Sequence, residues 1–318
     1  MSVTTSRQPR PSAQPGSGSP KVTVQTIQDK KIARIPIACL TAYDYPTARL
    51  VDECGIDLVL VGDSLAMVVL GYDSTLPVTM DEMLHHTRAV RRAVGRAMVV
   101  ADMPFGSYHA SVSEAVTNAA RFLKEAGAEA VKIEGGASRA ELVAALTAAE
   151  IPVLGHIGLT PQSLHKLGGY KVQGKTVATF DALIEDARAL ESAGSFAIVL
   201  EGVPSALAAS ITAQLSIPTI GIGAGPSCDG QILVFHDLVN LTFSPAAKFV
   251  RRYADAASLF REAITHYCED VVNHQFPSDA ESYHLPAETA ALLDMRASGQ
   301  REVGQRSSGP RPAARKKA

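Results

Sequence analysis

Five successive apolar segments in the middle of the chain each end in an ionisable side chain. The opposite ends of these segments are mostly apolar, or carry Pro, Ala or Gly. Charges that were merely solvated would be as frequent at both ends, and a buried charge needs a partner or a metal ion. The pattern therefore predicts one shared polar site, formed by Asp63, Asp102, Lys132, Glu134, His156 and Glu201.

Asp63, Asp102 and Glu134 supply hard oxygen donors from three neighbouring segments, with one His and no Cys nearby. Mg²⁺ takes one or two carboxylates and keeps water or substrate oxygens in its other positions, so the set favours Mg²⁺ over Zn²⁺. Lys132 lies two residues before Glu134, so both side chains point to one face of a strand. The pair is either an ion pair that only fills the interior or, beside a divalent ion, a site for an anionic substrate such as a carboxylate.

Glu201 follows His156 by one apolar segment and is predicted to lie on the far side of the ligand. A carboxylate in this position can act as a general base. A divalent ion that polarises a carbonyl beside a carboxylate base is suited to forming an enolate from a 2-oxo acid. The residues therefore predict carbon–carbon bond making or breaking through an enolate.

Eight β-branched apolar segments alternate with helical patterns and must position these side chains. The spacing of capping boxes at the starts of helices occurs at Thr79 with Glu82, Ser111 with Glu114, and Ser138 with Glu141. Parallel β/α units explain the alternation, and a closed (β/α)₈ barrel, a single-domain TIM barrel of the α/β class, explains the number eight. The predicted strands are residues 35–43, 57–64, 97–104, 130–136, 151–160, 196–203, 217–225 and 231–238.

A doubly wound sheet that binds a dinucleotide is the competing fold, because residues 221–225 read GIGAG. The G-x-G-x-x-G fingerprint fails, since Pro226 stands where the third glycine belongs. The stretch also comes late in the chain and does not open a first βαβ unit. We interpret it as a tight turn at the rim of the seventh strand, a region where barrels often bind an anion.

Composition agrees with a globular enzyme in a reducing compartment. The chain has 318 residues, of which 46% are hydrophobic and 19% charged, enough to form a large core. Its four cysteines have no C-x-x-C spacing, which argues against a zinc site or a disulfide framework. No apolar run approaches the roughly 20 residues of a membrane span. We expect a cytoplasmic protein without a membrane partner.

The two ends of the chain differ in character from the middle. We expect residues 1–21 to form a disordered tail, residues 22–285 the barrel, and residues 286–318 a basic extension that is disordered at its end. The formal net charge is −2, with +3 on residues 1–21 and +5 on residues 301–318, which leaves −10 for the rest. A basic tail raises the alternative of a non-catalytic binder of nucleic acid. Short tails are usually just solvated, so no nucleic-acid partner is expected.

Eight short stretches match sequence motifs of one enzyme family, in the same order along the chain. They are TAYDY (41–45), VGDSLAM (61–67), GYDSTLPVT (71–79), AVKIEGG (130–136), GHIGLTPQS (155–163), GGYKVQG (168–174), IGIGAG (220–225) and DGQILV (229–234). Together they closely resemble the ketopantoate hydroxymethyltransferase family, also called 3-methyl-2-oxobutanoate hydroxymethyltransferase. The resemblance extends from about residue 22 to residue 284.

This resemblance implies a (β/α)₈ barrel that transfers a hydroxymethyl group from 5,10-methylenetetrahydrofolate to 3-methyl-2-oxobutanoate. The product would be 2-dehydropantoate, used in pantothenate and coenzyme A synthesis. Members of the family are similar in forming large cytoplasmic homo-oligomers, commonly decamers, so a homodecamer is expected. A related magnesium barrel of the isocitrate lyase and phosphoenolpyruvate mutase type is the rival, and it would not need folate. A further alternative is a structural oligomer in which the site at the carboxyl end of the barrel no longer catalyses a reaction.

The family's functional positions carry over residue by residue. They imply that Mg²⁺ is bound by Asp63, Asp102 and Glu134, and that the oxo acid is contacted by Asp63, Ser64, Asp102 and Lys132. Glu201 matches the proton acceptor, and His156 an active-site histidine with a supporting, hydrogen-bonding role. The chain departs from the family at Ala66, usually Gly, and at Gly202, often Cys or another side chain. A methyl group at position 66 would disturb the loop if the backbone there needs a positive φ.

Overall fold

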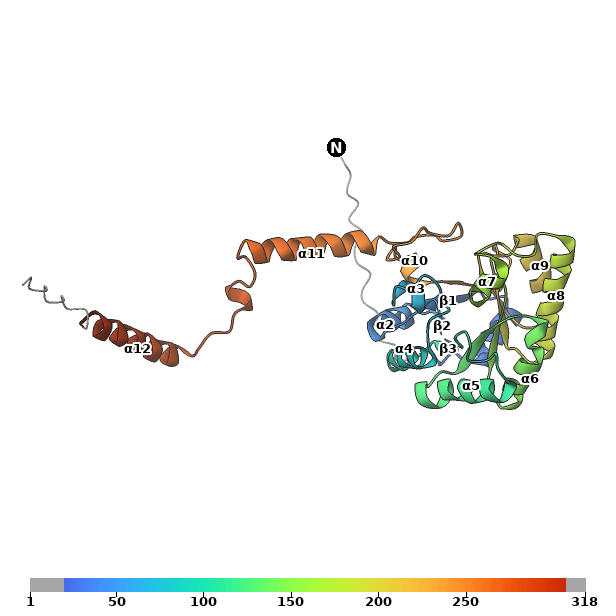
Figure 1. Ribbon diagram of the computed structural model, residues 1–318, viewed down its shortest axis with the longest axis horizontal. Helices are drawn as coiled ribbons and strands as arrows, with labels where there is room; N and C mark the ends of the chain where they lie inside the picture. Colours follow the sequence, from blue (N-terminus) through green and yellow to red (C-terminus); the bar gives the residue numbers. More distant parts are fainter. Residues whose placement is uncertain (1–19, 307–318) are drawn as a thin grey trace, which may run out of the picture. The chain divides into compact units, whose positions relative to one another are not determined.

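The computed structural model describes residues 20–306, and it contains a closed barrel of eight parallel strands in sequential order, β1 to β8 (Figure 1). The predicted (β/α)₈ barrel is confirmed. The strands are β1 Ile37–Thr41, β2 Leu58–Val61, β3 Met98–Asp102, β4 Ala130–Glu134, β5 Val153–Gly158, β6 Ala197–Glu201, β7 Thr219–Ile222 and β8 Gly230–Leu233.

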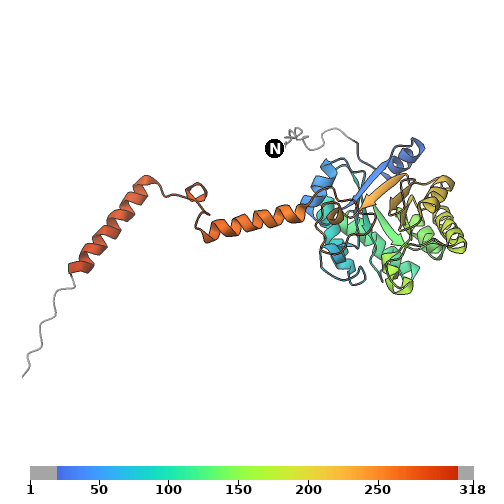
Figure 2. The same ribbon diagram turned by 90° about the horizontal axis from the view of Figure 1, so that it is seen from above.

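Helices follow most strands and pack around the barrel (Figures 1 and 2). The α-helices of this part are α1 Val24–Ile32, α2 Tyr45–Glu53, α3 Leu65–Val68, α4 Met80–Ala93, α5 Val112–Ala126, α6 Ala140–Ala148, α7 Leu164–Leu167, α8 Val177–Ser192, α9 Ser205–Gln214 and α10 Phe235–Leu238. Two 3₁₀-helices, η1 Ala137–Arg139 and η2 Pro161–Ser163, follow β4 and β5. None of the helices in the described residues is long and apolar enough to cross a membrane.

The chain divides into two compact units between residues 257 and 258. The first unit holds the barrel. Beyond the barrel, the chain forms α11 Ala256–Val272, which spans the division, then the 3₁₀-helix η3 Asp279–Glu281 and α12 Ala287–Arg306. Residues 1–19 of the predicted tail and residues 307–318 of the predicted basic extension lie outside the described residues, whereas the start of that extension forms α12.

The predicted caps at Thr79 and at Ser111, which accepts from the backbone N–H of Glu114 at the start of α5, are confirmed, and the one at Ser138 is wrong. Thr79 caps α4 by accepting from the backbone N–H of Glu82, and the Glu82 carboxylate accepts from Thr79. Ser138 instead lies inside η1, because Gly136 brings the chain against α8 and Ala137 donates its N–H to Asp186 (2.7 Å). The segment after β4 is thus fixed by a neighbouring helix, a tertiary contact that local spacing does not reveal.

The core has two layers that explain the nearly continuous apolar runs. Inward side chains such as Leu58, Val100 and Val199 fill the barrel, while outward ones such as Val59 and Ala101 pack under the helices. Adjacent residues of a strand point to opposite faces, so a strand covered on both sides is apolar throughout. Most polar side chains of the strands are therefore placed at or near the strand ends.

The amino-terminal end of the barrel is held by ion pairs around Asp57. This carboxylate is 2% exposed and contacts Lys30 (2.5 Å) and Arg96 (3.1 Å), while accepting the N–H of Ala38 (3.0 Å). Burial alone would raise the pKa of Asp57, but these contacts hold it below its usual value. The network joins α1 to β1 and to the segment before β3.

We expect Asp57→Asn to lower stability without affecting the carboxyl-end site. Removing one partner of a buried ion pair costs about 3 kcal/mol of unfolding free energy, because Lys30 and Arg96 would lose their counter-charge. Urea unfolding at pH 7 followed by circular dichroism measures the loss. Retained ligand affinity and turnover at 25 °C would show that the effect is confined to stability, whereas an unchanged unfolding midpoint would contradict the role given to Asp57.

Candidate active site

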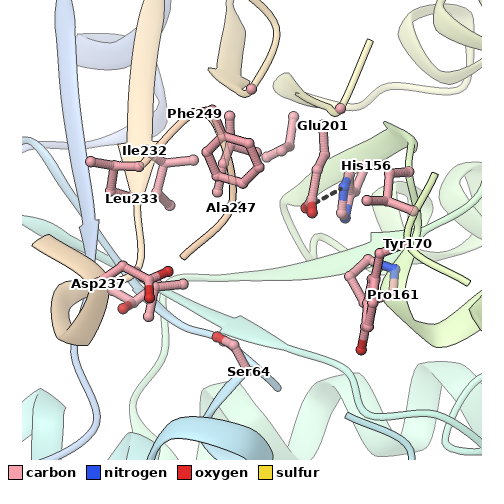
Figure 3. Close-up of a pocket in the computed structure, with 18 of the residues that line it drawn as sticks. Ser64, His156, Pro161, Tyr170, Glu201, Ile232, Leu233, Asp237, Ala247 and Phe249 are labelled. Atoms are coloured by element: carbon pink, nitrogen blue, oxygen red, sulfur yellow. Dashed lines mark ion pairs between the residues drawn. The ribbon is translucent and has the colours of Figure 1, made fainter. Parts of the chain in front are cut away.

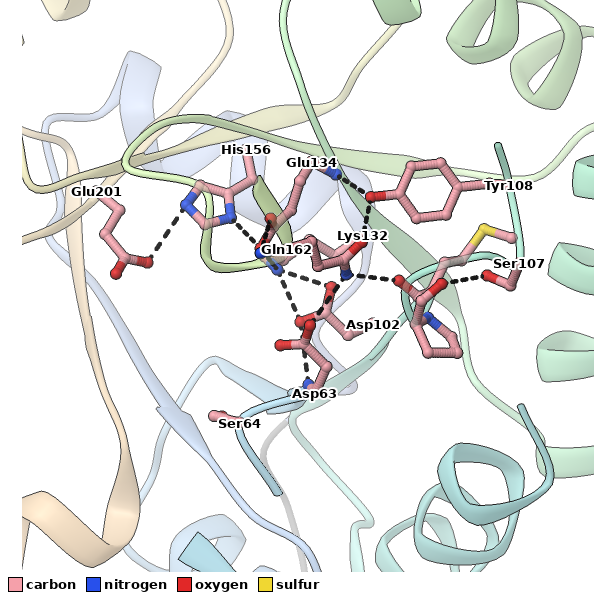
Figure 4. Close-up of polar contacts among 12 residues, drawn as sticks. Asp63, Ser64, Asp102, Ser107, Tyr108, Lys132, Glu134, His156, Gln162 and Glu201 are labelled. Carbon is pink, nitrogen blue, oxygen red and sulfur yellow. Dashed lines mark hydrogen bonds and ion pairs between the residues drawn. The ribbon is translucent and has the colours of Figure 1, made fainter. Parts of the chain in front are cut away.

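The carboxyl ends of the strands open into a cavity of about 1010 Å³. All seven residues predicted from the sequence line this cavity: Asp63, Ser64, Asp102, Lys132, Glu134, His156 and Glu201. Strand pairing explains their proximity, since Asp102 lies opposite Lys132 on β3 and β4, and Glu134 lies opposite His156 on β4 and β5. Figure 3 shows part of the cavity lining, and Figure 4 shows the seven side chains converging.

Lys132 and Asp102 form a buried ion pair at the centre of the site. The Lys132 ammonium lies 2.7 Å from both carboxylate oxygens of Asp102 and 3.8 Å from Oε1 of Glu134. Burial by itself would lower the pKa of Lys132, but the charges of Asp102, Glu134 and Asp63 raise it above its ordinary value. Lys132 is therefore a fixed cation at neutral pH.

Asp63 and Asp102 lie side by side, and one positive charge, that of Lys132, faces their two carboxylates. The backbone N–H of Asp63 donates to Oδ2 of Asp102 (3.2 Å). Burial raises the pKa of both carboxyls, and the charge of Glu134 adds to the shift in each. Two buried carboxylates that repel each other beside a single lysine would be stabilised by a divalent cation. The donor set therefore fits Mg²⁺.

Glu134, His156 and Glu201 form a line across the cavity (Figure 4). His156 Nδ1 lies 3.3 Å from Oε1 of Glu134, and Nε2 lies 3.3 Å from Oε2 of Glu201, although neither contact has hydrogen-bond geometry. Burial and the charge of Lys132 would lower the pKa of His156, but the two glutamates raise it to about 9. A protonated imidazole between two carboxylates fixes the position of Glu201 at the end of β6.

Gln162 is a site residue that charge patterning did not identify. It lies in η2, where its side-chain amide donates to Oδ2 of Asp63 (3.0 Å) and to the carbonyl of Met103 (2.9 Å). Its backbone N–H donates to Oε2 of Glu134 (2.9 Å), and Tyr108 donates to its amide oxygen (2.6 Å). Gln162 thereby orients two of the three predicted metal-binding carboxylates.

Ser64 is held by an aromatic residue that sequence reasoning also missed. The Tyr43 hydroxyl lies 2.8 Å from Ser64 Oγ, and the Tyr43 ring is fully buried after β1. His86 Nδ1 lies 2.6 Å from the Tyr43 carbonyl, so α4 fixes the backbone at this position. The TAYDY stretch carried the signal, but a buried Tyr after a strand also fits an ordinary core residue.

The structure explains the GIGAG turn and the two departures from the family pattern. Gly223 and Gly225 have positive φ angles of 62° and 81° at the end of β7, as expected for a tight turn at the rim. Ala66 lies buried in α3 and is not among the residues with positive φ, so its methyl group causes no backbone strain. Gly202, with φ of 55°, occupies the left-handed region beside Leu159.

The fold and these buried groups define an enzyme built on a (β/α)₈ barrel with its site at the carboxyl end. Solved structures with the same fold include 2,3-dimethylmalate lyase, a member of the PEP mutase/isocitrate lyase superfamily (TM-score 0.53, 14% identity, 90% of this chain and 99% of that one). Another is phosphonopyruvate hydrolase in complex with oxalate and Mg²⁺ (TM-score 0.51, 15% identity, 87% and 96%).

The chain belongs to the ketopantoate hydroxymethyltransferase family, whose sequence model matches residues 21–279. It is similar to 3-methyl-2-oxobutanoate hydroxymethyltransferase of Koribacter versatilis, with 65% identity over 86% of this chain and 93% of the relative. The enzyme of the same name from Carboxydothermus hydrogenoformans is 59% identical over 84% and 97%. The predicted family and enzyme class are thus confirmed, and the two solved structures, at 15% and 14% identity, show the fold alone.

Proposed function

We propose that the protein transfers a hydroxymethyl group from 5,10-methylenetetrahydrofolate to 3-methyl-2-oxobutanoate, giving 2-dehydropantoate for pantothenate and coenzyme A synthesis. The names of the relatives support the substrate and the product. The observation that carries the proposal is the arrangement within one cavity: a buried lysine and two repelling aspartates face a carboxylate, Glu201, beyond His156. Such an arrangement can bind an anionic oxo acid and remove a proton from it.

Asp63 and Asp102 would hold the Mg²⁺ ion, and both have pKa values raised by burial and by the charge of Glu134. When bound, the ion polarises the carbonyl and carboxylate oxygens of a 2-oxo acid. Within the described residues, no group of three or more His, Cys, Asp or Glu side chains is arranged around one metal position. Oε1 of Glu134 has no hydrogen bond, so Glu134 would be available as the third residue that holds the ion.

The remaining groups bind the oxo acid and move its proton. Lys132 and the Ser64 hydroxyl contact the substrate's anionic end, because both line the cavity next to Asp102 and Asp63. Glu201 accepts the proton from C3, and His156 keeps its carboxylate in place (3.3 Å). The resulting enolate carbon bonds to the methylene carbon of the folate, and water supplies the hydroxyl oxygen of the product. Both bonds from that carbon to N5 and N10 break, so tetrahydrofolate leaves with the proton taken from C3 and one proton from water on these nitrogens.

The test compares three reactions of the purified protein. We expect product formation from 3-methyl-2-oxobutanoate only when Mg²⁺ and methylenetetrahydrofolate are both present. Without folate, Mg²⁺ should still support exchange of the C3 proton for deuterium, because proton removal requires the oxo acid but not the second substrate. Turnover that does not depend on folate would overturn the transferase proposal and favour lyase or mutase chemistry.

We expect Gln162→Leu to raise the Mg²⁺ concentration needed for half-maximal activity by about 10- to 100-fold, the usual effect of losing a group that orients a metal ligand. Leucine keeps the volume but removes the donor to Asp63 (3.0 Å). Direct Mn²⁺ binding, followed by electron paramagnetic resonance, should weaken in parallel. The control is Gln25→Leu, which changes an amide on α1, outside the cavity. Equal Mn²⁺ affinity in the Gln162 variant and the control would contradict this role.

Subunit number and location follow the family resemblance. We propose a cytoplasmic homodecamer without nucleic-acid or membrane partners. Native mass spectrometry would show a particle of ten times the 33.5 kDa subunit mass. A monomer as the main species would overturn the oligomer proposal. A mobility shift of DNA or RNA that is lost on deleting residues 301–318 would instead support a binder of nucleic acid.

A further inference from the structure

The cavity is larger than a five-carbon oxo acid requires. Its volume of about 1010 Å³ reaches the upper end of the roughly 300–1,000 Å³ that drug-sized ligands occupy. The groups proposed to activate the oxo acid come from β2 to β6, whereas a second wall comes from residues 235–249, which follow β8. Proton removal from the oxo acid uses nothing on this second wall.

Asp237 on α10 is the acidic group of the second wall. Figure 3 places it across the cavity from His156 and Glu201. Thr242 donates to its Oδ1 (2.8 Å), which fixes the carboxylate while leaving it able to accept further hydrogen bonds. The helix itself is fixed, because Phe235 donates its N–H to Thr41 at the end of β1 (2.9 Å). Asp237 is thus a positioned carboxylate with no part in the chemistry described so far.

Phe249 gives the same wall an aromatic surface. Its ring packs directly on Gly223, where an added Cβ would lie 2.6 Å from Cδ1 of the ring. The ring lines the cavity together with the apolar side chains of Ile232 and Leu233, which Figure 3 shows nearby. The wall therefore contains one carboxylate and a flat apolar surface that line the same cavity, a combination suited to a planar heterocycle that carries hydrogen-bond donors.

We propose that Asp237 binds the pterin ring of the folate, by accepting hydrogen bonds from N3–H and the 2-amino group while the ring packs against Phe249. A carboxylate matches two adjacent donors on one edge of a ring. This inference rests on the proposed function, because it places the co-substrate of that reaction. It assigns residues 235–249 to the one-carbon donor and the strand ends to the oxo acid.

A short series of side-chain contacts links the proposed oxo acid site at Ser64 to the segment that carries Asp237. Ser64 Oγ, which contacts the oxo acid in the proposed function, lies 2.8 Å from the Tyr43 hydroxyl. The Tyr43 ring lies 5.4 Å from the ring of His236, and His236 is followed directly by Asp237. Ser64 and Asp237 both line the same cavity, so a pterin and the oxo acid would share it, as transfer of a methylene carbon between the two ligands requires.

The test separates folate binding from proton removal. In Asp237→Asn and Asp237→Ala, the KM for methylenetetrahydrofolate should rise about 10- to 100-fold, the loss expected for hydrogen bonds to a charged group. The C3 deuterium exchange measured without folate should stay within about twofold, as should the KM for the oxo acid. Asp181→Asn, an exposed carboxylate on α8 outside the cavity, serves as the control and should change neither.

A folate analogue without the 2-amino group tests the proposed hydrogen bonds to Asp237 directly. Tetrahydrofolate that lacks the 2-amino group should bind the wild type about tenfold more weakly than tetrahydrofolate, as measured by calorimetry, and Asp237→Ala should not distinguish the two. Equal discrimination by both proteins would overturn the proposal, as would an unchanged folate KM in the variants. If the wild type transfers no hydroxymethyl group, the proposed function fails. The calorimetry still decides the pterin site, because tetrahydrofolate binding that depends on Asp237 supports it, and equal or absent binding overturns it.

Discussion

Replacement of Glu201 with Gln is expected to slow C3 deuterium exchange of 3-methyl-2-oxobutanoate by about 10²- to 10⁴-fold, the contribution of a positioned general base. The amide has nearly the same shape but cannot accept the proton. Glutamine has nearly the size and reach of glutamate, so residue 201 should keep its position at the end of β6 and its contact with His156 (3.3 Å in the wild type). Proton NMR in D₂O, which follows loss of the C3 signal, measures the rate.

Oxo acid binding provides the internal control for this prediction. The affinity of Glu201→Gln for the oxo acid should stay within about threefold, because Asp63, Ser64, Asp102 and Lys132 remain unchanged. Glu185→Gln, on the exposed face of α8 and paired with Arg188, should exchange at the wild-type rate. Unimpaired exchange in Glu201→Gln would remove this residue from the role of base.

Lys132→Met is expected to reduce both stability and activity. The variant leaves Asp102 buried without its ammonium partner, 2.7 Å away in the wild type, which should cost about 3–5 kcal/mol of unfolding free energy. Loss of the fixed positive charge that is proposed to bind the substrate should lower kcat/KM by about 10²- to 10³-fold. Chemical unfolding and steady-state kinetics measure the two effects separately.

The stability deficit of Lys132→Met should depend on pH in a defined direction. Burial raises the pKa of both Asp63 and Asp102 in the folded state. Carboxyls with raised folded pKa values favour folding below their unfolded pKa and lose that contribution as the pH rises. The deficit should therefore shrink when the pH is lowered from 7 to 5. An equal deficit at both values would contradict the predicted charge imbalance.

Lys30→Met is the matched control for this variant. Lys30 pairs with buried Asp57 (2.5 Å) at the opposite end of the barrel, and Arg96 would still neutralise that carboxylate (3.1 Å). A smaller loss of stability and full activity are expected. A loss of activity equal to that of Lys132→Met would show that any broken internal ion pair disables the enzyme, and would remove the special role of Lys132.

The barrel and most of the site were predictable because both depend on strand periodicity. A strand covered on both faces must be apolar throughout, so a charge such as Asp102 or Glu201 marks the strand's end. Parallel strands bring those ends to one mouth. Gln162 escaped prediction because it is neutral and lies in the 3₁₀-helix η2, which reaches Asp63 only through the folding of the segment after β5.

Asp237 was obscured by an incorrect strand boundary. The predicted eighth strand covered residues 231–238, whereas β8 ends at Leu233 and α10 begins at Phe235. The apolar run continues across this boundary because Phe235 and Leu238 pack against the outer core layer. An uninterrupted apolar pattern therefore could not show where extended backbone gives way to helix.

The separation of the strand-end groups from the wall after β8 bears on how such enzymes can diversify. The strand-end groups lie on strands whose backbones are hydrogen-bonded into the barrel; these groups are Asp102, Lys132, Glu134, His156 and Glu201. Residues 235–249 form a short helix and a connecting segment, which tolerate substitution more readily. Selection from a library confined to 235–249 should therefore yield altered one-carbon donor preference in proteins that still deuterate the oxo acid at the parental rate.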